Sequence, residues 1–383
     1  MKRRTFTISF LLTIFICLAC LLAVRYFLNR NKSYLNRYVH QPVQIDEARL
    51  VQKNEPKNII LFIGDGMGVA HVFAGLTANQ GKLNLEYLKY IGFSKSQSSN
   101  KYITDSAAAA TAMASGVKTY NGALGVNSDT VSVTTILELA ENHGLSTGLI
   151  STSAVTHATP AAFIAHQKSR KLYESIAEDF LKTDVDVVIG GGWDHFADRE
   201  DKRSLIPLLE EKGYTVIRDT SYLAVTGTGK LFALLDSEHM PKARERRGLL
   251  TRAVKAALYR LSRNEKGFFL MVEGSQIDWG GHDNDTGYIV EEVLDMDMAL
   301  GAALEFAVKD GETLIICTAD HETGGMSCES GDISSDLIVA DYTTKHHTGV
   351  MIPVFSNGPG ADRFNGIYEN TELFYKMKDL LKL

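Results

Sequence analysis

The chain of 383 residues has few cysteines and no excess of basic residues. Its formal net charge is −6, which argues against a general nucleic-acid-binding protein, because such proteins usually carry a basic face. No internal repeat or low-complexity tract is present, so a repeat architecture is not indicated. Cys17 and Cys20 lie in an apolar N-terminal run, whereas Cys317 and Cys328 lie in the body. A disulfide between the latter two stays open, since spacing does not determine pairing.

The N-terminus has the features of a targeting segment. Basic residues at 2–4 precede an uncharged apolar run over 6–24, which Arg25 closes. The run is longer than a typical signal-peptide core and just long enough to span a bilayer. We therefore favour an uncleaved signal anchor. A cleaved signal peptide and a lipoprotein signal at Ala19-Cys20 are the alternatives.

This segment predicts N-terminal membrane contact and a periplasmic or extracytoplasmic location. The polar stretch that follows it lacks clear periodicity and is typical of a linker. The predicted organisation is a signal anchor or signal peptide at 1–28, a linker at 29–55 and the main domain at 56–383.

The body of the chain alternates short apolar runs with longer periodic segments. Predicted strands are 58–63, 146–151, 185–189, 267–272, 313–318 and 353–355; predicted helices are 132–141, capped by Ser132, 251–263 and 288–308. This alternation predicts an α/β fold whose large, mainly parallel central sheet has helices on both faces. Asp65, Glu273, Asp320 and His321 directly follow predicted strands. Because ligand sites in such sheets lie beyond the carboxyl ends of strands, we expect these side chains to converge.

A run of small residues over 104–112 (TDSAAAATA) predicts a helix that starts near Ser106 and stops at Gly116. The free N–H groups at a helix start favour anionic oxygen. A metal that lowers the pKa of the Ser106 hydroxyl would make it a nucleophile. Taken alone, this serine is more often an ordinary N-cap.

Further segments combine residue types that bind metals. Asp278 and His282 are four residues apart, so both reach one cation from a helical turn or a Gly-rich loop. Asp320 and His321 are adjacent, and His347 supplies a further nitrogen. With Asp65 and Glu273 added, the set suffices for two zinc ions with N/O ligands and one oxygen-ligated magnesium. Histidines without such a context, which we interpret as structural, are His71, His166 and His195.

Together these segments resemble the alkaline phosphatases. The resemblance covers roughly residues 57–360 and rests on motifs in the family's order: Asp65-Gly66-Met67-Gly68, 104–112, Thr159-Pro160-Ala161 through Ser169-Arg170, 273–282, 320–325 and 347–349. It implies a three-layer α/β fold, a homodimer, and hydrolysis of small phosphate monoesters to an alcohol and inorganic phosphate.

The resemblance also implies a role for each site residue. The first zinc would be held by Asp278, His282 and His347, the second by Asp65, Asp320 and His321, and the magnesium by Asp65, Thr159 and Glu273. Ser106 would attack phosphorus and become a phosphoserine. Arg170 would grip the remaining phosphate oxygens in a bidentate manner.

Two positions depart from the best-known enterobacterial pattern. His157 stands where that pattern has Asp, and Trp279 stands where it has Lys. An imidazole lowers the negative charge near the third site, which leaves the identity of the third metal open, and the loss of Lys predicts faster product release. The interval 322–346 is short enough for a loop or small hairpin, so we expect an open active site and broad monoester specificity.

Two other functions are alternatives. A related metallo-hydrolase would act on phosphodiesters or sulfate esters, but the residues after Ser106 lack the C/S-x-P-x-R pattern of a sulfatase. A membrane-tethered, non-catalytic phosphate- or metal-binding protein would not need both a nucleophile and a full set of ligands.

Overall fold

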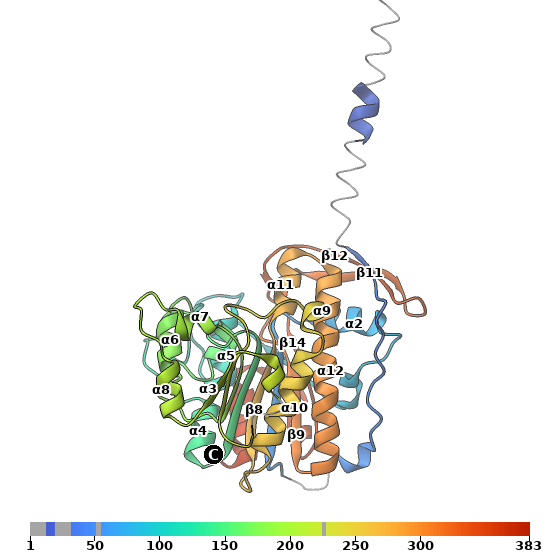
Figure 1. Ribbon diagram of the computed structural model, residues 1–383. Helices are drawn as coiled ribbons and strands as arrows, with labels where there is room; N and C mark the ends of the chain where they lie inside the picture. The colour runs from blue at the N-terminus through green and yellow to red at the C-terminus, as the bar shows by residue number, and fades with distance from the viewer. Residues whose placement is uncertain (1–12, 20–31, 51–54, 224–226) are drawn as a thin grey trace, which may run out of the picture.

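The structure is a computed structural model of the chain. It describes residues 13–19, 32–50, 55–223 and 227–383 (Figure 1). Most of the segment predicted as a signal anchor at 1–28 lies outside the described residues. In the part of the chain that is described, no helix is both long and apolar enough to cross a bilayer.

A large twisted sheet forms the centre of the molecule, with ten strands within the described residues. In spatial order the strands are β15 (Gly366–Glu369), β3 (Tyr90–Lys95), β14 (Ile352–Asn357), β9 (Thr313–Thr318), β2 (Asn58–Gly64), β8 (Phe268–Gly274), β4 (Ser146–Ala154), β5 (Val187–Gly191), β7 (Leu231–Leu234) and β6 (Thr215–Ile217). Among these described strands, β14 alone runs against the common direction. The prediction of a mainly parallel α/β sheet is therefore confirmed.

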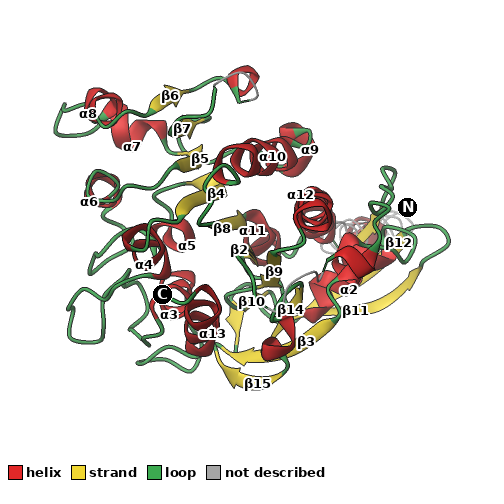
Figure 2. Cartoon of the chain, turned by 90° about the horizontal axis from the view of Figure 1, so that it is seen from below, coloured by secondary structure: helices red, strands yellow, loops and turns green. Residues whose placement is uncertain are grey.

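Helices cover both faces of this sheet and make three layers (Figure 2). One face carries α2 (Val69–Thr77), α9 (Ala243–Arg246), α10 (Leu249–Leu261) and α12 (Thr286–Asp310). The other carries α3 (Ser106–Ser115), α4 (Ile136–Asn142), α5 (Ala158–Ala161), α6 (Tyr173–Asp179), α7 (Trp193–Ala197), α8 (Ile206–Glu211) and α13 (Thr371–Leu381). Successive side chains of β2 alternate between the two layers: Ile60 and Phe62 pack with α10 and α12, and Ile59 and Leu61 with α3 and α13. Burial on both faces explains why these strands are apolar throughout.

A smaller structure lies over the carboxyl ends of the central strands, at the top of Figure 1. Here α11 (Gln276–Asp283) follows β8, and a hairpin of β11 (Met326–Asp332) and β12 (Leu337–Tyr342) follows β9. Two short strands, β10 (Glu322–Thr323) and β13 (His347–Thr348), pair beside the hairpin. The interval 322–346 thus holds a small hairpin, as predicted.

Residues 32–50, expected within the linker, lie against the catalytic body. The strand β1 (Ser33–Leu35) pairs antiparallel with β12, and the side chain of Leu50 is buried. His40 Nε2 lies 2.8 Å from the carboxylate of Asp297 in α12. Short 3-10 helices complete the described chain at Glu47–Arg49, Asn84–Tyr87, Thr220–Tyr222 and Ala361–Phe364.

One local expectation is wrong, and one point left open by the sequence is decided. The helix expected from 132 begins at Ile136, because Thr135 rather than Ser132 is its cap: the Thr135 hydroxyl accepts from the Glu138 N–H at 3.2 Å, and the Glu138 carboxylate accepts from the Thr135 N–H at 2.7 Å. Cys317 and Cys328 are free thiols, so the disulfide left open above is not formed.

Candidate active site

Acidic side chains collect at the carboxyl end of the central strands. Asp65 follows β2, Glu273 lies at the end of β8, and Asp320 follows β9. The strands β8, β2 and β9 are adjacent and parallel, so their ends meet at one edge of the sheet. All three carboxylates are essentially inaccessible to solvent. This is the convergence that the sequence predicted.

Three groups of carboxylate and imidazole ligands form at this edge, counted within the described residues. They are Asp278, His282 and His347; Asp65, Asp320 and His321; and Asp65, His157 and Glu273. Asp65 belongs to two of them. The structure thus brings together the predicted ligands, and His157, predicted as a neighbour of the third site, takes part in the third group. Thr159 lies fully buried in α5, and its hydroxyl has no hydrogen-bond partner among the described residues.

The spacing of the donor atoms fits small tetrahedral ions. His282 Nε2 and His347 Nε2 lie 3.4 and 3.6 Å from Asp278 Oδ1. His321 Nε2 lies 3.5 Å from Asp65 Oδ1 and 3.2 Å from Asp320 Oδ2. Zinc–ligand bonds of about 2.0–2.2 Å at tetrahedral angles separate neighbouring donors by roughly 3.3–3.6 Å.

The orientation of each imidazole supports the same interpretation. His282 Nδ1 lies 2.6 Å from the Lys345 carbonyl, and His347 Nδ1 lies 3.0 Å from the Thr104 carbonyl. A carbonyl oxygen only accepts, so each Nδ1 carries a proton and Nε2 is the nitrogen that is available to a metal. Metal-binding histidines in proteins are usually fixed in this way.

Buried acceptors without partners mark the centre of the site. Within the described residues, both oxygens of Asp65, Oε1 of Glu273 and Oδ2 of Asp320 have no hydrogen-bond partner. Burial raises the pKa of Glu273 to about 7 and the pKa of Asp320 to about 6. Burial and the charge of Asp320 raise the pKa of Asp65 as well. Buried carboxylates arranged so are typical of sites that hold cations.

The pKa values of Asp278, His282 and His321 are also shifted. Burial opposes ionisation of Asp278, yet the hydrogen bond with His282 and the charges of His321 and His347 hold its pKa below the usual value. In the metal-free chain the hydrogen bond with Asp278 raises the pKa of His282 to about 9, so this imidazole releases a proton when it binds a metal. Burial lowers the pKa of His321 well below its usual 6.5, so this imidazole stays neutral, as a ligand must.

Ser106 is the first residue of α3 and is almost completely buried. Its Oγ lies 3.3 Å from His321 Nε2, beside the second group. Asp105, not Ser106, is the N-cap, since its carboxylate accepts from the Ala108 N–H at 3.0 Å. The interpretation of Ser106 as an ordinary cap is therefore wrong, and its hydroxyl faces the ligands.

Arg170 approaches the same serine segment from the loop before α6. Its Nη1 donates to Asp105 Oδ2 at 3.2 Å, and its Nη2 lies 3.2 Å from His157 Nε2. Burial and the charge of Arg170 hold the pKa of His157 well below its usual value. Trp279 follows Asp278 in α11, and its ring lies 6.2 Å from the ring of His157.

Sequence reasoning missed three contributors. Asp105 both caps α3 and holds Arg170, and Thr323 donates from its hydroxyl to Asp278 Oδ1 at 2.5 Å. His239 packs its ring 4.8 Å from the Trp279 ring. Asp105 has a local signal, since Asp is a preferred N-cap. Thr323 lies within the motif at 320–325, where no role was assigned to it, and His239 has no signal because it reaches the site through tertiary packing.

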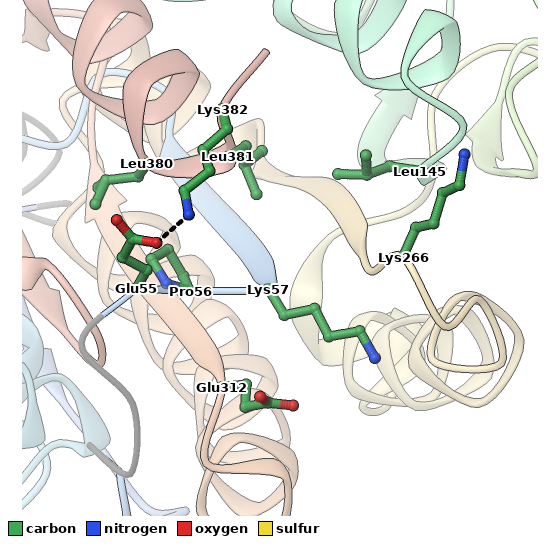
Figure 3. A pocket seen from close by; sticks show the side chains of 9 residues that line it. All are labelled: Glu55, Pro56, Lys57, Leu145, Lys266, Glu312, Leu380, Leu381 and Lys382. Carbon is green, nitrogen blue, oxygen red and sulfur yellow. Dashed lines mark ion pairs between the residues drawn. The ribbon is translucent and has the colours of Figure 1, made fainter.

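A separate pocket of about 560 Å³ lies at the opposite edge of the sheet (Figure 3). Lys57, Leu145, Lys266 and Glu312 line it, and each comes within two residues before a central strand. An ion pair between Glu55 and Lys382 lies beside it. The pocket is therefore remote from the ligand groups at the carboxyl ends of the strands.

Carboxylate–imidazole groups around a buried serine at a helix start, on a mainly parallel sheet, define a metal-dependent hydrolase. The sequence model described as alkaline phosphatase matches residues 56–337. The chain therefore belongs to the alkaline phosphatase family. It is an enzyme with phosphatase activity, as the sequence predicted.

Individual relatives agree with this assignment. Alkaline phosphatase 3 of Bacillus subtilis (strain 168) is 40% identical, over 85% of this chain and 89% of its own. Alkaline phosphatase of Escherichia coli (strain K12) is 33% identical, over 85% and 86%. The solved alkaline phosphatase from the Antarctic bacterium TAB5 shares 41% identity over 86% of this chain and 99% of its own, with a TM-score of 0.82. A mutant of that enzyme with a histidine changed to aspartate has Mg bound in its M3 site. It shares 40% identity over 86% of this chain and 99% of its own, with a TM-score of 0.81.

Proposed function

We propose that the chain hydrolyses phosphate monoesters in two steps through a phosphoserine on Ser106. The observation that carries this proposal is the 3.3 Å distance between Ser106 Oγ and His321 Nε2, which puts the hydroxyl against a ligand group. The proposed ligands are Asp278, His282 and His347 for one zinc, Asp65, Asp320 and His321 for a second, and Asp65, Thr159 and Glu273 for a magnesium, with His157 and Trp279 as its neighbours. When bound, such ions lower the pKa of the attacking hydroxyl and neutralise negative charge on the phosphate and leaving oxygens.

The protein groups then act as follows. Arg170, fixed by Asp105, donates two hydrogen bonds to phosphate oxygens and orients the phosphorus toward Ser106. Ser106 Oγ attacks, the ester P–O bond breaks, and the alcohol leaves with a proton. Water then attacks the phosphoserine, inorganic phosphate leaves, and the serine hydroxyl recovers its proton. The N-terminus of α3 stabilises the anionic oxygens in both steps.

The identity of the metal at the third group depends on which of its residues, Asp65, His157 and Glu273, act as ligands. Asp65 and Glu273 offer hard oxygen ligands, which suit magnesium, whereas the nitrogen of His157 also suits zinc. The Mg found in the M3 site of the TAB5 mutant supports magnesium for a carboxylate-rich version of this site. Metal analysis of the purified chain by mass spectrometry distinguishes the two ions.

The finer biological context rests on the resemblance and on the N-terminal segment. We propose a periplasmic or extracytoplasmic enzyme, held at a membrane by that segment, that forms a homodimer and accepts many small monoesters. Mass spectrometry of the mature N-terminus tests cleavage, and sedimentation analysis tests the dimer. A sharp preference for one substrate over a generic aryl phosphate would contradict the open site.

The deciding experiment replaces the nucleophile. Ser106→Ala is expected to lower kcat for an aryl phosphate at least about 10³-fold while metal content is unchanged. Ser115→Ala, at the buried far end of the same helix, is the matched control and should keep activity. Acid quenching with radiolabelled substrate should place the label on Ser106. Retained activity in Ser106→Ala, or faster turnover of phosphodiesters or sulfate esters, would refute the proposal.

A further inference from the structure

His157 lies between Arg170 and the third ligand group, and both need the lone pair of its ring nitrogen. Its Nε2 lies 3.2 Å from Arg170 Nη2. A guanidinium has donors and no acceptor, so in this contact His157 Nε2 must offer its lone pair. The ring is then neutral and its proton is on Nδ1, which is buried without a hydrogen-bond partner among the described residues.

The same ring belongs to the third ligand group. One of its nitrogens lies within 4.8 Å of carboxylate oxygens of Asp65 and Glu273. A neutral imidazole has a single available nitrogen lone pair, and its other nitrogen carries a proton. A metal ion bound to either nitrogen of His157 uses this lone pair. Arg170 would then face a proton or a coordinated nitrogen, and neither accepts a hydrogen bond.

Neighbouring rings hold the ring of His157 in place between Arg170 and the third ligand group. The ring of His239 lies 5.4 Å away and that of Trp279 6.2 Å away, both edge-on at 89°. His239 is itself fixed, because its Nδ1 accepts from the Ala154 N–H at 3.1 Å. The adjacent Met240 carbonyl accepts from Gln276 of α11 at 2.7 Å. Packing on two sides therefore restricts rotation of the His157 ring away from Arg170.

We propose that Arg170 and a metal ion at the third group compete for the lone pair of His157. The inference rests on the proposed function. It makes His157 a positioning residue, which acts on phosphate through Arg170. With its lone pair free, His157 and Asp105 hold the two terminal nitrogens of Arg170. With a metal on His157, Arg170 keeps Asp105 alone and binds phosphate less tightly. Because coupling between two binding sites is reciprocal, bound phosphate lowers the affinity of the third group for its metal ion by the same factor.

The competition is specific to an imidazole. A carboxylate at position 157 has two oxygens, so one can accept from Arg170 while the other faces the metal. His157→Asp therefore removes the competition without removing either interaction. His157→Phe keeps a ring against His239 and Trp279 and offers neither interaction.

The test measures binding of inorganic phosphate by calorimetry to protein loaded with two and then three equivalents of Zn²⁺, with metal content checked by mass spectrometry. In the unmodified chain the third equivalent should raise the Kd for phosphate about 5- to 10-fold, within the usual range of coupling between sites. In His157→Asp the change should stay below about twofold. In His157→Phe, which guards against misfolding of the aspartate variant, phosphate should bind weakly at either loading.

The outcomes separate this inference from the proposed function. Uptake of three equivalents with an unchanged Kd, or equal changes in the unmodified chain and His157→Asp, refutes the competition alone. Failure to take up a third equivalent of Zn²⁺ refutes zinc binding at the third group and the competition with it, whereas the proposed magnesium site is tested separately by the metal analysis given above. Labelling of Ser106 by substrate is unaffected by either result and reports on the nucleophile separately.

Discussion

Removal of the bound metals should make folding strongly dependent on pH. Without cations, Glu273 and Asp320 are buried beside other carboxylates, and burial raises their pKa values to about 7 and about 6 from the usual 4.5 and 3.8. The folded chain then keeps protons that the unfolded chain has lost. The contribution of these two groups to stability is therefore greatest at low pH and falls as the pH rises from their unfolded pKa values toward their folded ones.

The magnitude follows from the size of the shift. A change of one in pKa corresponds to about 1.4 kcal/mol. Ionisation of Glu273 alone therefore lowers the free energy of unfolding by about 3 kcal/mol, and most of this loss occurs between pH 5 and 8. Urea unfolding of chelator-treated protein at pH 5, 6, 7 and 8 measures the change. The metal-loaded protein should show little of it, because the cations compensate the carboxylates.

Glu273→Gln provides the matched control for this prediction. The amide has a similar shape and no charge, so the apoprotein of this variant should lose less stability across the same pH range. A free energy of unfolding that stays level, or rises, between pH 5 and 8 in the chelator-treated chain would refute the reasoning.

Two substitutions outside the ligand groups give further predictions. Asp105→Ala removes the N-cap of α3 and a partner of Arg170, so we expect a loss of about 1 kcal/mol in urea unfolding and a raised KM in steady-state kinetics; an unchanged KM would contradict the contact. His166 lies 2.9 Å from Glu138, and this hydrogen bond raises its pKa, so the contact stabilises the fold below the unfolded pKa of 6.5 and is lost as the pH rises through the folded value. His166→Gln should accordingly cost about 1 kcal/mol at pH 6 and less at pH 9, and an equal cost at both would count against an ionic contribution.

The sequence was most informative where chemistry follows an uninterrupted apolar run. The strands that end at Asp65, Glu273 and Asp320 are recognisable because both faces of the sheet are covered, and parallel pairing brings their ends together. The start of α3 at Ser106 was recognisable from its small residues. In each case a local pattern and the rules of sheet topology suffice.

Other parts of the site depend on contacts that leave no period in the sequence. The stretch 32–50 is held by backbone pairing with β12 and by single contacts such as that of His40 with Asp297, so it needs no periodic run of apolar side chains. His239 reaches Trp279 from a loop between β7 and α9. Such contacts link residues far apart in the chain, so a single sequence gives no signal for them.

The two outer strands of the main sheet have a consequence for association between molecules. The outer strands β15 and β6 span four and three residues, whereas β4 near the centre spans nine. Each outer strand therefore presents few unpaired N–H and C=O groups to another chain. A long sheet of this kind is thus poorly suited to grow by strand addition at its edges, and this should limit aggregation of the concentrated enzyme.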